Sequence, residues 1–413
     1  MSDEISIDLR TYFTQSRDEF DDNFISIPYP PYFRVAESPA YGDDQLAASY
    51  AGINFELLGG QLQNRLAAIG SMSDRLTFPA PGQPDDFTAR GDAGRFEYQG
   101  ILSVDSENQA TFGAEYENTF LNTHSIFDTT PVTRGHKEVV GTYAQWQSTL
   151  FSALTLTGGF RYDHDEEFGT HVSVKLAGAY QLNDGATILR ANFGNGFKAP
   201  SLYELDSEYS NPLTALKPEL GEGWEAGVDQ SLFGGTTRLS LTWFDRHETD
   251  QIEFFDCFGP TSPACDLRYL VGGYYENIGR TRADGLEAEA AIALTDSLKA
   301  DLGFTGMAAI DEATGHNLAR VPDRTAEANV FWAPLHELSL GVGVAYVSHR
   351  FDDEADQVLL KSNLLLNLYA SYALTDKLGL FGRIENVTNL RYEPLFGYGA
   401  QGQAFFAGIR ATY

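Results

Sequence analysis

The sequence has few basic side chains and no long apolar runs. Lys and Arg together number 28 against 58 Asp and Glu, which gives a formal net charge of −30. A chain this acidic has no basic patch that could release counterions from phosphates, so DNA and RNA are not expected partners. No segment approaches the ~18 consecutive apolar residues that a transmembrane helix needs, which excludes a helical membrane protein.

Cysteine is equally scarce, with two residues in the whole chain. Cys257 and Cys265 enclose a short segment that contains Gly and Pro. Two closely spaced cysteines in such a loop predict a disulfide. Metal ligation is the alternative, but no His or further Cys lies nearby in the sequence.

The apolar residues that are present follow a period of two. Leu364, Leu366 and Leu368 alternate with polar residues such as Asn363 and Asn367. The same alternation recurs at 154–163, 286–294 and 378–385. This period is typical of β-strands with one apolar face and one polar face.

Short turns alternate with long polar loops along the chain. Turns are predicted near 59, 107, 184, 234, 296 and 376, and the longer loops near 17–44, 80–94, 124–137, 198–218, 252–272, 311–317, 351–357 and 390–401. We therefore predict about eighteen antiparallel strands at 5–16, 45–57, 61–79, 95–106, 109–123, 138–151, 153–166, 168–182, 185–197, 219–233, 236–251, 273–294, 297–310, 318–333, 337–350, 358–374, 377–389 and 402–413.

This layout predicts an all-β fold, a transmembrane antiparallel β-barrel with long loops outside the cell and short turns in the periplasm. A soluble propeller or sandwich is the alternative. A propeller would show a blade repeat of ~40 residues, which the sequence lacks. A sandwich of this length would need several domains with linkers, and no Pro/Ser-rich break occurs. Residues 1–413 are therefore expected to form one domain.

One segment carries a family signature. It consists of Phe197, Lys198, Ala199, Pro200, Leu202 and Glu204, followed by Asn211, Pro212, Lys217, Pro218 and Glu219. This pattern resembles the TonB-dependent outer-membrane receptors, in which such a stretch leads from a strand into an external loop and back. Three extra residues interrupt its second half here. The blocks at 158–163 and 383–389 are also similar to family blocks, and the ending at 392–399 looks most like the vitamin B12 (cobalamin) transporter branch.

The resemblance implies a barrel of about 22 strands, of which about 18 are visible. The signal peptide, TonB box, plug domain and roughly the first four strands would lie outside these residues. We therefore expect a fragment, a misassigned start or a barrel that closes with fewer strands. The chain as given is not expected to be a competent transporter, because TonB would act only through the plug.

The resemblance also implies location, partners and ligand. The chain is expected in the outer membrane of a Gram-negative cell, in contact with its lipids, as a receptor for TonB-dependent uptake of a large scarce nutrient. A cobalamin-like ligand is favoured, and a ferric siderophore is the sibling alternative. A plugless, passive porin-like or surface-binding barrel is the second functional class.

Acidic residues allow two further hypotheses. In the cobalamin branch calcium orders external loops, and Asp21, Asp43 and Asp44 are the positions that match; otherwise these loops are unliganded, and no other cofactor is expected. His164 lies among Asp163, Asp165, Glu166 and Glu167, which could form a metal or acid–base cluster. A solvated acidic rim is the simpler interpretation, so we expect no enzyme.

Overall fold

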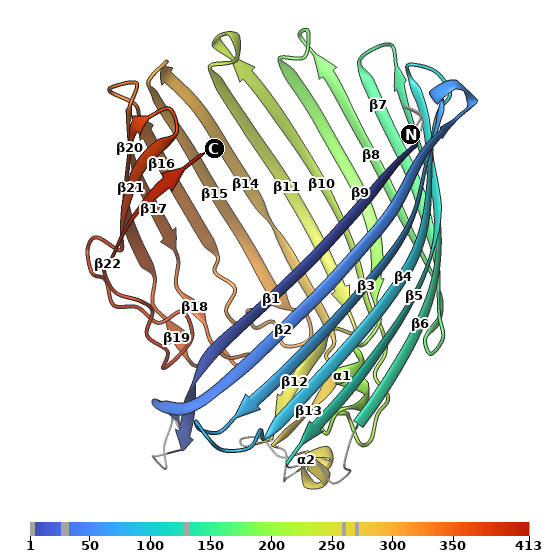
Figure 1. Ribbon diagram of the computed structural model, residues 1–413, viewed down its shortest axis with the longest axis vertical. Coiled ribbons are helices and arrows are strands. Elements are labelled where there is room, and N and C mark those ends of the chain that lie inside the picture. Colours follow the sequence, from blue (N-terminus) through green and yellow to red (C-terminus); the bar gives the residue numbers. More distant parts are fainter. Residues whose placement is uncertain (1–4, 26–32, 127–132, 258–261, 269–271, 413) are drawn as a thin grey trace. The chain divides into compact units, whose positions relative to one another are not determined.

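The computed structural model describes residues 5–25, 33–126, 133–257, 262–268 and 272–412. Eighteen antiparallel strands form one sheet, and two further pairs of short strands lie in connections (Figure 1). The all-β class and the eighteen strands predicted from the period of two are confirmed. The chain divides into two units, which are described separately: residues 1–177, 194–222 and 248–279, and residues 178–193, 223–247 and 280–413.

The first unit is an up-and-down series of long strands. These are β1 (Ile5–Ile25), β2 (Phe33–Leu57), β3 (Leu62–Phe78), β4 (Phe87–Ser103), β5 (Asn108–Ser125), β6 (Thr133–Leu150) and β7 (Leu154–Asp165). Each strand pairs with the next in unbroken antiparallel register, apart from one bulge between Glu19 and Asp21 in β1. The strands β8 (Gly169–Leu182), β9 (Thr187–Lys198), β10 (Glu219–Leu232) and β11 (Thr237–Thr249) each contribute residues to both units.

The second unit continues with the same pattern. Its strands are β14 (Arg280–Thr295), β15 (Leu298–Asp311), β16 (Arg324–Trp332), β17 (Leu338–Val347), β20 (Asn363–Thr375), β21 (Leu378–Glu385) and β22 (Ala404–Ala411). The small pair β18 (Arg350–Phe351) and β19 (Leu359–Leu360) lies in the connection between β17 and β20. Tyr413, which the sequence predicts as the last residue of a strand, lies outside the described residues.

The register places residues of one kind side by side, so the sheet has an apolar face and a polar face. On the apolar face of the first unit Ile7 lies opposite Ile53, and Ile53 lies opposite Leu66. Phe96 and Tyr116 continue this face on β4 and β5. Many side chains on it are exposed, because no described residue covers them.

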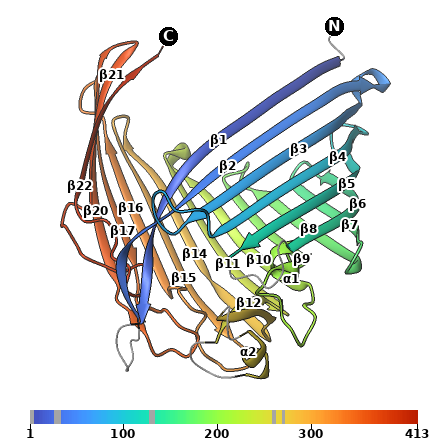
Figure 2. The ribbon, with the colours of Figure 1, turned by 60° about the horizontal axis from the view of Figure 1, so that its bottom comes forward.

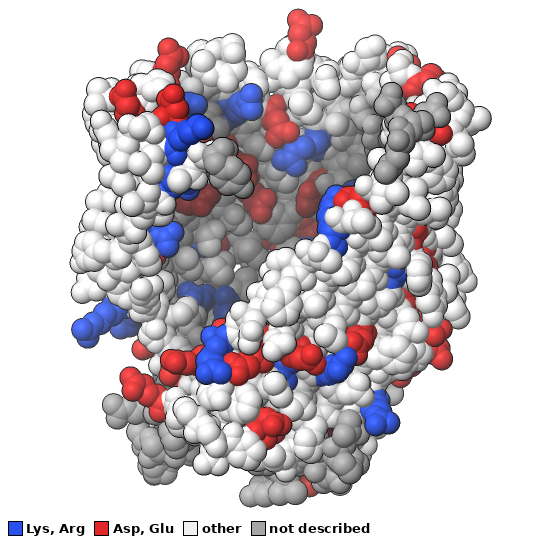
Figure 3. All heavy atoms as spheres, viewed as in Figure 1, with Lys and Arg blue, Asp and Glu red and all other residues white. Residues whose placement is uncertain are grey.

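A row of charges bounds this apolar face. Arg17 Nε lies 2.7 Å from Asp43 Oδ1, and Arg90 Nε lies 3.9 Å from Asp74 Oδ1. The four residues occupy neighbouring positions on β1 to β4, on the side of the sheet that bears Ile7 and Ile53. Figure 3 shows acidic and basic side chains crossing the long strands of this unit in one row, beside a broad stretch without charge. We call these four residues the charge row.

Three features differ from the sequence-based expectation. The loop predicted at 17–44 is wrong, because β1 and β2 remain paired as far as Ile25 and Phe33. Charged residues such as Arg17, Asp18, Asp43 and Asp44 stand at consecutive positions here, so the sequence resembles a loop although the two strands are paired. The strand predicted at 273–294 is two strands, β13 (Gly273–Asn277) and β14, and the loops predicted at 80–94 and 124–137 lose residues to β4, β5 and β6.

Among the described residues, no helix is both long enough and apolar enough to cross a bilayer. The helices α1 (Leu202–Asp206) and α2 (Pro263–Arg268) are short and lie in connections between strands. A small buried cluster lies in the connection that contains α2. It consists of Ala264, Cys265 and Tyr274, and Phe255 and Cys257 pack against it.

The two faces make a prediction for adjacent residues of β7. Leu156 belongs to the apolar face and Thr157 to the polar face. In a barrel that spans a bilayer, Leu156→Lys should lower the free energy of unfolding by about 2–4 kcal/mol, because the charge is placed in lipid. Thr157→Lys is the matched control and should cost far less. Urea titration of the folded protein in lipid vesicles measures both, and equal losses would contradict the assignment of the faces.

Candidate functional site

The family motif forms the connection between β9 and β10, which includes α1. Ser201 caps this helix, since its Oγ accepts a hydrogen bond from the Glu204 N–H at 3.2 Å. In return the Ser201 N–H donates to Glu204 Oε2 at 2.6 Å, which completes a capping box. Pro200 and Leu202 are buried. The motif's Pro, Leu and Glu therefore anchor and begin the helix.

The second half of the motif turns the chain back toward the sheet. Asn211 Oδ1 accepts hydrogen bonds from the backbone N–H groups of Leu213 at 3.0 Å and Thr214 at 2.9 Å, and Pro212 lies inside this turn. Glu219, the first residue of β10, forms an ion pair with Lys198 Nζ at 3.0 Å. The two ends of the motif are thereby held together.

The remaining motif residues pack or connect the same loop. The ring of Phe197 stacks on His171 with 4.0 Å between the ring centroids, which joins β9 to β8. Ala199 and Pro218 are half-buried, and the Lys217 side chain is exposed, 3.6 Å from Asp250. These contacts assign the whole motif a role in supporting the loop.

A second long connection, between β11 and β14, packs beside this loop. It contains the strand β12 (Ile252–Asp256), then α2, then β13, and β12 pairs with β13 (Figure 2). Cys257 and Cys265 form a disulfide here, with Cα atoms 5.4 Å apart. The bridge ties α2 to the end of β12, so this loop carries its own covalent brace.

Asn277 joins the two connections. Its Oδ1 accepts a hydrogen bond from the Lys217 N–H at 2.8 Å, and its Nδ2 donates to the Lys217 carbonyl at 2.9 Å. The Ile252 N–H also donates to Glu219 Oε1 at 2.8 Å. The Asn277 side chain thus bonds both the N–H and the C=O of Lys217, and these contacts hold the two loops together. We call residues 197–219, 250–257, 262–268 and 272–278 the loop platform.

Aromatic rings from both loops meet on this platform. The ring of Tyr203 lies 6.2 Å from Tyr209 and 6.4 Å from Tyr275, and Phe254 lies 5.4 Å from Tyr209 and 5.3 Å from Tyr275. Phe87 at the start of β4 joins them, 6.3 Å from Tyr203. The side chain of Phe254 is 44% exposed. We call these five rings the aromatic cluster; they contact one another, and part of their surface is accessible.

Two carboxyl groups at the edge of the loop platform, those of Asp206 and Glu167, lie where their charged form is disfavoured. Burial raises the pKa of Asp206 at the end of α1. Burial, and then repulsion from Asp206 and Asp165, raises the pKa of Glu167. Asp206 lies close to Gly135 on β6: a Cβ added at Gly135 would come 2.5 Å from Asp206 Oδ2. The nearby Lys137 Nζ lies 3.3 Å from Asp165.

Burial also raises the pKa of Tyr275, and the nearby carboxylates of Glu204 and Glu208 raise it further. This phenol therefore stays neutral in the aromatic cluster over the physiological range.

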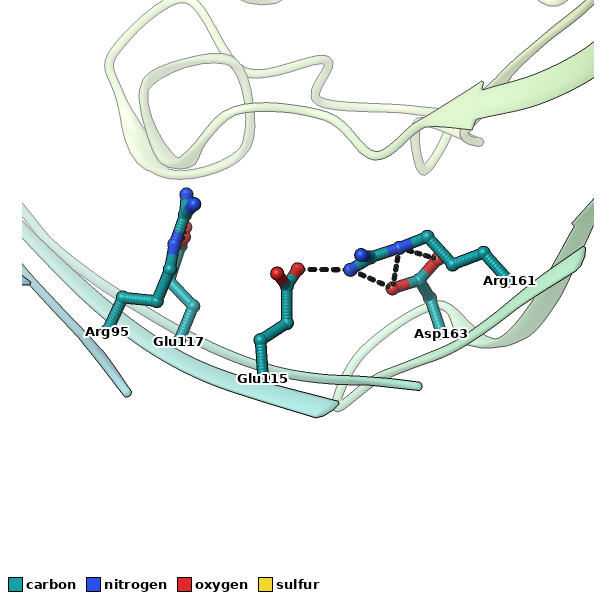
Figure 4. Close-up of polar contacts among 5 residues, drawn as sticks. All are labelled: Arg95, Glu115, Glu117, Arg161 and Asp163. Carbon is teal, nitrogen blue, oxygen red and sulfur yellow. Dashed lines mark hydrogen bonds and ion pairs between the residues drawn. The ribbon is translucent and has the colours of Figure 1, made fainter. Parts of the chain in front are cut away.

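Farther along the strands the polar face carries a network of ion pairs (Figure 4). Arg161 on β7 pairs with Asp163 two residues away, at 2.7 Å, and reaches across β6 to Glu115 on β5. Gly141 lies opposite both acids in the register, and a Cβ there would collide with the Arg161 guanidinium. Arg95 and Glu117 form a separate pair at 2.6 Å.

The acids proposed for calcium do not converge. Asp43 and Asp44 are adjacent in β2, so their side chains point to opposite faces of the sheet. Asp43 is held by Arg17 and Asp44 by Arg75, each at 2.7 Å, while Asp21 lies opposite Glu37. Within the described parts of the chain, no group of three or more His, Cys, Asp or Glu could hold a metal ion. Calcium binding stays a prediction.

His164 does not form an acid–base pair with its acidic neighbours. Its Nδ1 lies 3.4 Å from Thr170 Oγ1, while Asp163 and Asp165 occupy the other face of β7 with Arg161 and Lys137 as partners. The cluster suggested by the sequence is therefore divided between two faces of one strand.

Comparison with known proteins agrees with this architecture. A family model described as "TonB dependent receptor-like, beta-barrel" matches residues 3–387. The chain belongs to the TonB-dependent receptor family. Its members are transport receptors built as outer-membrane β-barrels.

The relatives of this receptor chain include transporters for one vitamin. It is 29% identical over 262 residues to the vitamin B12 transporter BtuB of Photobacterium profundum, covering 62% of this chain and 40% of the relative. It is 26% identical over 275 residues to BtuB of Vibrio cholerae, covering 64% and 40%. The receptor chain thus spans less than half the length of the curated relatives it matches.

Solved structures show the same fold. A ferric enterobactin receptor, PfeA of Pseudomonas aeruginosa, aligns with a TM-score of 0.78 at 18% identity, covering all of this chain and 68% of that one. The siderophore receptor PirA of Acinetobacter baumannii aligns with a TM-score of 0.79 at 15% identity, covering 100% and 69%.

Sequence reasoning missed the aromatic cluster and the role of Asn277. Phe87, Tyr203 and Tyr275 are far apart in the chain and come together only through loop packing. The one available signal was the density of tyrosine in the predicted external loops. Asn277 ends a strand that the sequence analysis placed inside a longer one.

The close approach at Gly141 predicts an effect on stability. Gly141→Val should lower the free energy of unfolding by about 1–3 kcal/mol, because the new side chain displaces Arg161 from Glu115. Gly94→Val is the matched control, since a Cβ at Gly94 meets no atom within 4 Å. Chemical denaturation of both variants checks the prediction. A loss in the control as large as that at position 141 would overturn it.

The raised pKa of Asp206 predicts a pH dependence of α1 docking. A carboxyl group whose pKa is higher in the docked state favours docking while it is protonated. This contribution is lost as the pH rises above the ordinary carboxyl pKa. Asp206→Asn should therefore protect α1 more than wild type at neutral pH and equally at acidic pH. Amide hydrogen exchange of residues 202–206 measures this, and an Asn effect that does not vary with pH would contradict it.

Proposed function

We propose that this chain is the ligand-capturing barrel of an outer-membrane receptor for TonB-dependent uptake of a large, scarce nutrient, with cobalamin as the favoured ligand. The observation that carries the proposal is the loop platform. Its family motif caps and closes the first loop, and Phe254 of the aromatic cluster is 44% exposed. Rigid aromatic surface binds large ligands at a low cost in side-chain entropy.

Two observations support cobalamin as the first candidate. The curated relatives whose sequences match at 26–29% identity carry the name vitamin B12 transporter. The aromatic cluster provides apolar surface for a bulky organic ligand, whereas the loop platform has no array of basic side chains for a highly charged anion. A ferric siderophore is the second candidate, because the structural neighbours are siderophore receptors.

We further propose that energy coupling depends on a plug domain supplied by sequence outside residues 1–413. We expect the plug domain to contact the polar face of the barrel. On that face the charges of the first unit are largely paired among themselves, as in the pairs of Arg161 with Asp163 and Arg95 with Glu117. When the charges of the polar face are already paired, a polar domain can bind there and leave few buried charges without a partner.

A binding measurement tests the aromatic cluster. In the plug-containing receptor, Phe254→Ala should weaken the binding of cyanocobalamin about 3- to 10-fold, because one stacking contact contributes about 0.5–1.5 kcal/mol. Phe304→Ala is the matched control, since Phe304 is similarly exposed but lies on the apolar face of β15. Tighter binding of a ferric catecholate than of cyanocobalamin would favour the siderophore candidate.

Uptake in a receptor-deficient strain separates transport from passive permeation. The plug-containing receptor should accumulate ligand only when TonB is present, and residues 1–413 alone should not. Leakage of many small solutes without TonB would support the porin-like alternative. TonB-dependent uptake by residues 1–413 alone would contradict the requirement for a plug.

A further inference from the structure

A row of aromatic and basic side chains crosses the polar face of the second unit. In register order it consists of Lys299 (β15), Phe331 (β16), Gly341 (β17), Tyr369 (β20), Arg383 (β21) and Phe406 (β22). Phe381 lies on the same face of β21, two residues from Arg383. The four aromatic residues Phe331, Tyr369, Phe381 and Phe406 are 47%, 39%, 41% and 38% exposed. They therefore do not form a buried core.

These four rings do not belong to the surface that faces lipid. Side chains alternate between the two faces along a strand, so Phe331 and its neighbour Trp332 lie on opposite faces. Trp332 pairs with Leu298 and Leu340 on the apolar face, whereas Phe331 pairs with Lys299. Contact with lipid therefore does not account for the four rings. An exposed group of large rings on a polar face is a feature that points to a binding partner.

Glycines leave room for these rings to lie against the sheet. A Cβ added at Gly341 would come 3.4 Å from Tyr369 Cδ2 and 3.6 Å from Phe331 Cδ1, so this glycine lies between the two rings. A Cβ added at Gly408 would collide with the ring of Phe381. Because the rings lie against the backbone and are still partly exposed, they offer a surface on which a flat apolar group can stack.

Two arginines accompany the rings. The Arg383 guanidinium carbon lies 4.3 Å from the centre of the Phe406 ring, and its Nε lies 3.0 Å from Glu385 Oε1. The guanidinium carbon of Arg410 lies 5.8 Å from the centre of the Phe381 ring. Both distances allow a cation–π interaction, so the rings and the cations form one continuous surface.

Lys299 and Arg410 carry positive charge that the described part of the chain does not neutralise. Neither forms an ion pair with a described carboxylate, although the net charge of the chain is −30. The next row of the same face, toward the long connections, contains Asp301, Asn329 and Asn367 and no ring. The rings and cations are thus confined to the short-turn ends of the strands. We call the four rings with Lys299, Arg383 and Arg410 the ring–cation patch.

We propose that the ring–cation patch is a binding site for an organic anion with a flat, apolar body. The rings stack on the body, and Lys299 and Arg410 attract the negative charge. Neighbouring strands lie ~4.8 Å apart, so the rings from β16 to β22 extend over ~19 Å, which suits a ligand larger than one ring system. The site lies far along the strands from the long connections, and it does not depend on the ligand proposed for the loop platform.

Charge favours this ligand over a purely apolar partner. Farther along the same face the strands carry Glu287, Glu289 and Glu327, so cations without an acidic partner are an exception on this part of the sheet. Rings alone would suit any apolar surface, including a surface of the plug domain. Rings that lie beside unneutralised cations suit a partner that presents an apolar body and an anionic group together.

Fluorescence polarisation with two flavins tests the proposal on the full chain folded in detergent micelles. Riboflavin 5′-phosphate and riboflavin share one ring system, and only the first carries a phosphate group. We expect riboflavin 5′-phosphate to bind several-fold more tightly. The double variant Lys299→Gln with Arg410→Gln should lower its affinity to that of riboflavin. Absence of binding, or equal affinities of the unsubstituted chain for the two flavins, overturns the proposal.

Ring variants test the stacking contact. Phe331→Leu and Tyr369→Leu should each weaken the binding of riboflavin 5′-phosphate about 3- to 10-fold, because they remove a ring and keep an apolar side chain. Tyr369→Phe should retain the affinity. Trp332→Leu is the matched control, since Trp332 is 48% exposed on the apolar face. Ring variants without effect, or an equal loss in the control, contradict the proposal.

The plug-containing receptor separates a ligand site from a contact with the plug. A ligand site predicts that Tyr369→Leu weakens flavin binding by residues 1–413 and leaves the leakage of small solutes through the plug-containing receptor unchanged. If the patch instead holds the plug, Tyr369→Leu raises this leakage and leaves flavin binding by residues 1–413 unchanged. The second result would overturn the proposal.

Discussion

The antiparallel register is the constraint on which the rest of the structure depends. Each strand pairs with its neighbour residue by residue, and a shift by one position would exchange the two faces of the sheet. Ile7 lies beside Ile53 and Ile53 beside Leu66 for this reason. The continuous pairing also hydrogen-bonds the backbone N–H and C=O groups, which lipid cannot do. The same pairing therefore determines the two faces and allows the strands to lie in a membrane.

Regular pairing forces the polar face to accommodate charges at close range, and small residues make this possible. Glu115 and Asp163 would repel each other across β6 if no cation lay between them. Arg161 lies there because Gly141 has no side chain to exclude it. The position of a glycine in one strand thus decides whether three charges on two other strands form a network or a cluster of like charges.

The sequence predicted the sheet well and the loops less well, for a physical reason. A strand's alternation is local, so Leu364, Leu366 and Leu368 suffice to assign their face. It failed at 17–44, where β1 and β2 extend with polar residues on both sides and the pattern no longer differs from that of a loop. The disulfide follows from two neighbouring cysteines, but the contact between Tyr203 and Tyr275 depends on the packing of two separate connections and has no local signature.

The residues of the family motif and those of the aromatic cluster largely differ, and so do their contacts. Pro200, Leu202 and Glu204 are buried or engaged in the cap of α1, so changes there would move the loop rather than alter a contact with ligand. Phe254, the exposed member of the aromatic cluster, lies on β12 and takes no part in the cap of α1. The loop scaffold and the accessible ring thus depend on different contacts, so a change at one need not change the other.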